Sequence, residues 1–106
     1  MTTIVAVTAC PSGVAHTYMA AEALENAAKA KGWNVKVETQ GSIGLENELT
    51  ADDIASADIV ILTKDISIKF EERFAGKTIV RVNISDAVKR ADAIINKIES
   101  HLAQTA

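Results

Sequence analysis

Two runs of apolar residues are long enough to be strands, and neither run alternates with polar residues. They are Ile4–Val7 and Ile59–Leu62, within predicted strands Thr3–Thr8 and Ile59–Thr63. A strand that is apolar on both faces is typical of the middle of a parallel sheet covered on both sides. We therefore predict that these two strands lie at the centre of the sheet.

Two other segments alternate apolar and polar positions. In Asn34–Thr39, Val35 and Val37 alternate with Lys36 and Glu38. The segment Thr78–Val82 places Arg81 among apolar neighbours. Period-two alternation predicts strands with one face in water. We expect both strands at the edges of the sheet, with Glu38 on a solvated face.

The intervening segments have helical spacing. Alanines and Leu24 recur every three or four residues over Thr17–Lys31, and Gly32 follows as a stop signal. Thr50 is the expected N-cap of a short helix ending near Ser56, and Ser85 is the expected N-cap of the last helix. A further helical turn is predicted at residues 69–74, with 40–44 and 64–68 as loops.

This alternation of strands and helices predicts a single α/β domain over residues 1–106. The fold expected is a three-layer sandwich, with a four-stranded parallel sheet of order 2-1-3-4 and helices on both faces. Ligands of such sheets bind beyond the carboxyl ends of the strands, where the order reverses. Four segments should meet on that rim: the loop after the first strand, residues 39–41, residues 63–65 and residues 83–85.

Composition narrows the class of protein. The net charge is −3 and no basic face is evident, so a nucleic-acid binder is not expected. No apolar run reaches the length of a membrane span, and the N-terminus lacks the pattern of a signal peptide. A single cysteine cannot form an internal disulfide, which fits a reducing compartment. We expect a cytoplasmic domain that needs no cofactor.

The chemistry is concentrated between the first strand and the first helix, where the chain reads Cys-Pro-Ser-Gly-Val-Ala-His-Thr from Cys10 to Thr17. Backbone N–H groups and the helix dipole make such a loop a site for an anion, most often phosphate. A cysteine at this position has a lowered thiol pKa and exposes a thiolate. The pattern predicts that Cys10 is a nucleophile. The expected phosphate-binding residues are Ser12, Gly13, Val14, Ala15, His16 and Thr17.

The spacing resembles that of cysteine-based phosphatases, in which an arginine stands six residues after the cysteine and Ser or Thr follows. Here His16 takes the arginine's place, and Thr17 follows it. Arginine binds phosphoryl oxygens permanently and with two donors, whereas histidine gives at most a weaker, pH-dependent contact. The departure favours a protein that holds a phosphoryl group over one that hydrolyses it. A small cysteine phosphatase remains the alternative, and a flavodoxin-like flavin or nucleotide binder is a third possibility.

The stretch Val7–Glu22 closely resembles the start of IIB domains of the fructose family of bacterial sugar phosphotransferase systems. Residues Val37–Ser42 and Gly44 resemble that family's second block, and the resemblance extends over essentially the whole chain.

The resemblance implies a phosphotransferase that works through a phosphocysteine intermediate. In that family the cysteine matching Cys10 accepts a phosphoryl group from a phosphohistidine of the IIA domain. It passes the group to a sugar held by the membrane component IIC. The residues matching Ser12–Thr17 cradle the phosphate.

The sequence leaves two contacts open. His16 lies in the predicted loop and Lys64 on the predicted rim, and either could touch the phosphate. A zinc site is not expected, because Cys10 and His16 have no evident ligand pair and His101 lies in the distant last helix.

Overall fold

A computed structural model describes residues 2–9, 14–41, 44–64, 68 and 70–105, with side chains omitted at 14–16, 41, 44–45 and 103–105. The elements, in chain order, are β1 (Thr3–Ala9), α1 (Val14–Ala30), β2 (Asn34–Gly41), β3 (Gly44–Glu46), α2 (Ala51–Ser56), β4 (Ile59–Thr63), the 3₁₀ helix η1 (Glu71–Phe74), β5 (Ile79–Val82), α3 (Ile84–Lys89) and α4 (Ala91–Thr105).

The sheet has the order β3-β2-β1-β4-β5. Four of its strands, β2, β1, β4 and β5, are parallel, and they reproduce the predicted order 2-1-3-4. The central strands β1 and β4 are buried, as their continuous apolar runs predicted. The added strand β3 is antiparallel to the end of β2, in a segment where the sequence predicted only a loop.

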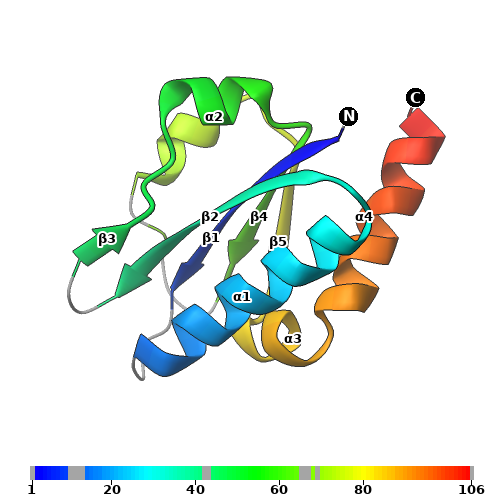
Figure 1. The fold of residues 1–106 in the computed structure, drawn as a ribbon. Helices are drawn as coiled ribbons and strands as arrows, with labels where there is room; N and C mark the ends of the chain where they lie inside the picture. The colour runs from blue at the N-terminus through cyan, green and yellow to red at the C-terminus, as the bar shows by residue number, and fades with distance from the viewer. Residues whose placement is uncertain (1, 10–13, 42–43, 65–67, 69, 106) are drawn as a thin grey trace.

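Helices cover both faces of the sheet, which confirms the three-layer architecture (Figure 1). On one face, α1, α3 and α4 pack on alternate residues of β1 and β4, including Ile4 and Ala6. On the other face, Val5, Val7 and Ala9 pack with residues of α2 and with Phe74 of η1. Small alanines on α1, among them Ala20 and Ala28, are fully buried and allow a close approach to the sheet.

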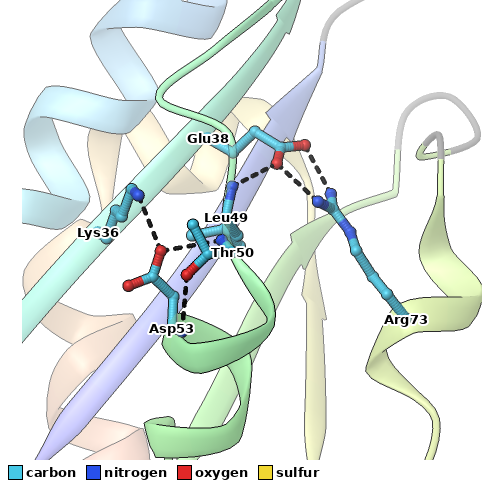
Figure 2. A network of polar contacts seen from close by, with 6 residues as sticks. All are labelled: Lys36, Glu38, Leu49, Thr50, Asp53 and Arg73. Carbon is cyan, nitrogen blue, oxygen red and sulfur yellow. Dashed lines mark hydrogen bonds and ion pairs between the residues drawn. The ribbon is translucent and has the colours of Figure 1, made fainter.

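The expectation for Glu38 was wrong, because its side chain is fully buried. Arg73 of η1 donates two hydrogen bonds to the Glu38 carboxylate, at 2.8 and 2.6 Å. The backbone N–H of Leu49 donates to the same carboxylate at 2.9 Å (Figure 2). Gln40 Nε2 also donates to it, at 2.8 Å. This network replaces water on that face of β2 and attaches both η1 and the segment before α2 to the sheet.

The hydrogen bonds also determine the charge on Glu38. Burial alone would raise the pKa of this carboxyl, but the hydrogen bonds from Arg73, Gln40 and Leu49 outweigh it and lower the pKa. Glu38 is therefore ionised in the folded protein near neutral pH.

The helix boundaries differ from the predictions at both ends of the chain. α1 begins at Val14, three residues earlier than the pattern indicated. Thr50 is the N-cap of α2, as predicted, and forms a capping box with Asp53. Ser85 does not cap the last helix, because Asn83 precedes α3 and the chain leaves helical geometry at Arg90 before α4 begins. Residues 77–106 contain no glycine or proline that would have signalled this break.

Breaking the Glu38–Arg73 pair should lower the free energy of unfolding by about 3 kcal/mol, since a buried charge then loses its partner. We expect this loss in Glu38→Gln, measured by urea unfolding. Replacing both residues, as Glu38→Leu with Arg73→Leu, should recover much of it. Glu71→Gln is the control, because Glu71 pairs with Arg81 at the surface and its loss should have a far smaller effect. Equal effects of Glu38→Gln and Glu71→Gln would contradict the assignment.

The lowered pKa of Glu38 also predicts a pH dependence. The unfolded chain takes up a proton near the ordinary value of 4.5, whereas folded Glu38 does so only at a lower pH. The stabilisation is present above pH 4.5 and is lost as the pH falls through the folded value. Below pH 4.5 the wild type should therefore lose stability more steeply than Glu38→Gln. Parallel stability curves for the two proteins would refute this.

Candidate functional site

The carboxyl ends of the four parallel strands form one rim of the sheet. Their register places Ala9 beside Gln40 and Thr63 beside Val82. The strand arrows of β1, β2 and β4 point toward the end of the molecule at which α1 begins (Figure 1). The connection between Ala9 and Val14, which contains Cys10, therefore joins a buried strand to a helix N-terminus at this rim.

The predicted site residues fall into three groups. Cys10, Ser12 and Gly13 lie outside the described residues, so their roles stay predictions. Val14, Ala15 and His16 form the first turn of α1, but their side chains are not described, and a contact of His16 with phosphate stays a prediction. Thr17 is described with its side chain.

The first turn of α1 has the backbone groups that an anion requires. The N–H groups at the start of an α-helix have no partner within the helix, and in α1 they include those of residues 14–16. α1 is 17 residues long, so its dipole adds partial positive charge at this end. The early start of α1 places these donors immediately after Gly13, closer to Cys10 in sequence than predicted.

Thr17 contributes an unsatisfied hydroxyl to this turn. Its side chain is 1% exposed, and its Oγ1 has no hydrogen-bond partner among the described residues. A buried hydroxyl without a partner is costly, and native proteins rarely keep one without a ligand or a functional reason. The hydroxyl is therefore available to an anion bound at the start of α1.

Lys64 lies where the rim meets a groove. The backbone N–H of Lys64 donates to Val82 O at 2.9 Å. Lys64 is exposed and lines a groove of about 560 Å³ between β5, α3 and α4. Arg90 and Lys97 also line it, and within the described part of the chain none of these three cations forms an ion pair. Asp86 is the acidic residue of the lining. Positive charge thus adjoins the rim, while a contact of Lys64 with phosphate stays untested.

Sequence reasoning missed the roles of two residues beside the loop: Thr8, and Thr63, which it placed only within the rim segment 63–65. Both are buried, and their hydroxyls bond to backbone groups on either side of residues 10–13. The available signal was a hydroxyl residue at the end of each central apolar strand. It was overlooked because threonine is common in strands on propensity alone.

In the ranges that the structure describes, His, Cys, Asp and Glu side chains form no cluster of three that could hold a metal ion. Among the helices of those same ranges, none combines the length and apolarity needed to cross a bilayer.

Comparisons with known proteins agree with one another. Residues 5–97 match the family described as "PTS system, Lactose/Cellobiose specific IIB subunit". The chain is 90% identical to the fructose-like EIIB component 2 of Escherichia coli K12 over the full length of both. It is 49% identical to part of a fructose-specific EIIB'BC component of Haemophilus influenzae, covering 89% of this chain and 17% of that protein.

A solved structure extends the likeness to the fold. The solution structure of an Enzyme IIB subunit of a phosphotransferase system from Escherichia coli K12 has a TM-score of 0.93 to this chain. The two are 44% identical, and the match covers 98% of this chain and 96% of that one. Strand order and helix placement are therefore those of known IIB structures.

The Thr17 hydroxyl should matter to ligand binding and not to folding. Thr17→Val keeps the shape of the side chain and removes the unsatisfied group, so the free energy of unfolding should stay unchanged or rise by up to about 1 kcal/mol. Urea unfolding measures this. The same variant should lose affinity for inorganic phosphate, followed by NMR shifts of the α1 amides. A clear loss of stability would show that the hydroxyl has a structural partner instead.

Proposed function

The chain belongs to the fructose-like IIB components of bacterial sugar phosphotransferase systems, and on this premise we propose that Cys10 is the residue that is phosphorylated. Cys10 accepts a phosphoryl group from a phosphohistidine on a IIA protein. It then passes the group to a sugar bound by the membrane component IIC during uptake.

The transfer consists of two displacements at phosphorus. The Cys10 thiolate attacks the phosphohistidine, so an S–P bond forms, the N–P bond breaks, and the histidine keeps the electron pair. A sugar hydroxyl then attacks the phosphocysteine, the S–P bond breaks and the thiolate is regenerated, while the hydroxyl proton is released. Because each step only exchanges a nucleophile, no metal or redox cofactor of this chain is required.

The observation that carries the proposal is the position of the only cysteine in the sequence. Cys10 directly follows a buried strand at the rim and stands four residues before a 17-residue helix begins. The free N–H groups of residues 14–16 and the Thr17 hydroxyl are suitable donors for phosphoryl oxygens, together with the backbone of Ser12 and Gly13 that the sequence predicts. The helix N-terminus also stabilises the thiolate that the first step needs.

The absence of an arginine at position 16 fits a relay. Hydrolysis of the phosphocysteine would release the phosphoryl group to water before it reached the sugar. An arginine favours such hydrolysis, because it binds the phosphoryl oxygens of the transition state permanently and with two donors. His16 at this position would give at most a weaker, pH-dependent hold on phosphoryl oxygens. A small cysteine phosphatase is the alternative that this difference argues against.

The proposed partners need an exposed surface near Cys10. Tyr18 and Met19, in the first two turns of α1, are 38% and 50% exposed, which is high for large apolar side chains near a site. Val14, Ile43 and Ile66 are further apolar residues that we expect around Cys10 from the sequence, and their side chains lie outside the described residues. Such a surface suits brief docking with IIA and then with IIC, at the cytoplasmic side of the membrane.

The sugar is not determined by the chain. The family description names lactose and cellobiose, while the relatives are named for fructose. Since IIC holds the sugar in the proposed scheme, specificity would lie in that partner.

The test is mass spectrometry of the protein after incubation with phosphoenolpyruvate and its upstream carrier proteins, including the cognate IIA. One phosphoryl group should appear, located on Cys10, and Cys10→Ser should abolish it while circular dichroism shows an unchanged fold. Phosphorylation of Cys10→Ser at the normal yield would refute the assignment.

An aryl phosphate distinguishes the alternative function. Without a phosphohistidine donor, the wild type should release no phosphate from it above the rate of Cys10→Ser. Steady release that depends on Cys10 would indicate a phosphatase.

A further inference from the structure

Both ends of the Cys10 loop are held by buried threonine hydroxyls. Ala9 is the last residue of β1 and Thr17 belongs to the first turn of α1. Thr63 bonds to the backbone of Ala9, and Thr8 bonds to the backbone of Thr17. All four residues are at most 1% exposed, so water cannot substitute for these bonds.

The Thr63 hydroxyl satisfies both backbone groups of Ala9. Its Oγ1 accepts from the Ala9 N–H at 3.0 Å and donates to the Ala9 carbonyl at 3.2 Å. One hydroxyl can do both, since it has one donor hydrogen and two acceptor lone pairs. The Ala9 carbonyl is part of the peptide bond to Cys10, so this contact reaches the peptide group that carries the nucleophile.

The hydroxyl stands where the regular pairing of β1 with β4 has ended. The register of the two strands runs from Ile4 with Ile59 to Val7 with Leu62 and includes neither Ala9 nor Thr63. Without the hydroxyl, the backbone of Ala9 would face β4 with no described partner on that strand. A valine at position 63 would fill the same space but leave buried N–H and C=O groups unpaired.

Thr8 secures the other end of the loop. Its Oγ1 donates to the Thr17 carbonyl at 3.1 Å, and its side chain is fully buried. This bond connects the end of β1 directly to the first turn of α1, across the residues that contain Cys10. Thr8 and Thr63 lie on the same face of the sheet, the face covered by α1. Thr8 continues the alternation of Ile4 and Ala6 in β1, and Thr63 continues that of Ile59 and Ile61 in β4.

We propose that Thr8 and Thr63 are positioning residues that hold the Cys10 thiolate in register with the free N–H groups of α1. The inference rests on the proposed function of Cys10. Each hydroxyl fixes one end of the loop, so losing either would let the sulfur move relative to the helix N-terminus. Small displacements of a reacting atom are costly, of the order of a hundredfold for about 1 Å.

The test uses Thr63→Val and Thr8→Val, each compared with its serine variant, which keeps the hydroxyl. The first readout is the pH profile of Cys10 alkylation by iodoacetamide, which is unambiguous because the chain has one cysteine. The valine variants should raise the apparent thiol pKa, since the thiolate loses its alignment with the helix N-terminus. The serine variants should restore the wild-type profile.

The second readout is the rate of phosphoryl acceptance from phosphorylated IIA. The valine variants should be about tenfold to a hundredfold slower, and the serine variants should come close to the wild-type rate. The alkylation profile needs no phosphoryl donor, so it tests the positioning even if Cys10 proves not to be the acceptor. Absence of phosphorylation in the wild type would instead count against the proposed function.

Ile59→Val is the matched control, because Ile59 is buried at the opposite end of β4 and contacts neither end of the loop. It should lower stability and leave both readouts unchanged. Folded valine variants with a wild-type alkylation profile would overturn the proposal, as would serine variants no better than valine. If Thr63→Val does not fold, Thr8→Val and Thr8→Ser provide the same comparison at the other end of the loop.

Discussion

The structure depends on the burial of β1 and β4 between two layers of helix. Strands covered on both faces admit almost no polar side chain along their length, and their backbone groups must pair within the sheet. Polar residues therefore appear where the strands end, and in a parallel sheet all of these ends lie on one rim. Thr8 and Thr63 occupy such positions, and Cys10 stands two residues after Thr8 in the sequence. The site is thus a consequence of how the core is built.

The same requirement explains why Glu38 is ionised inside the molecule. β2 carries polar residues on a face that η1 and the segment before α2 cover, so the carboxylate needs internal partners. Arg73 and the Leu49 N–H provide them (Figure 2). Gln40 adds a further hydrogen bond. In return, the charge adds polar contacts to two segments that Phe74 and Leu49 also attach to the sheet by apolar packing. A polar network of this kind specifies one arrangement of loops more than it adds stability.

Sequence patterns predicted the four parallel strands, their order and the position of the rim, because apolar runs and alternation report burial directly. They failed where tertiary contacts decide. The alternation of polar and apolar residues predicted a solvated Glu38. Its partner Arg73 lies 35 positions away in the sequence, so no pattern near Glu38 could indicate the contact. β3 is three residues long and forms only by pairing with the end of β2, and the break at Arg90 has no glycine or proline to mark it. For the site, the loop motif indicated Cys10, whereas the hydrogen bonds of Thr8 and Thr63 required coordinates.

The first strand begins and the last helix ends on the side of the sheet opposite to the rim (Figure 1). β1 starts at the amino end of the sheet, and α4 finishes there, with Glu99 paired to Lys31 beside the turn that leads into β2. Both ends therefore lie away from the rim (Figure 1). A linker attached at either end would leave the Cys10 side unobstructed, so the same domain can work alone or covalently tethered. The Haemophilus influenzae relative, in which the matching region is 17% of the protein, shows that evolution has used the tethered form. Tethering would raise the effective concentration of a partner without any new contact.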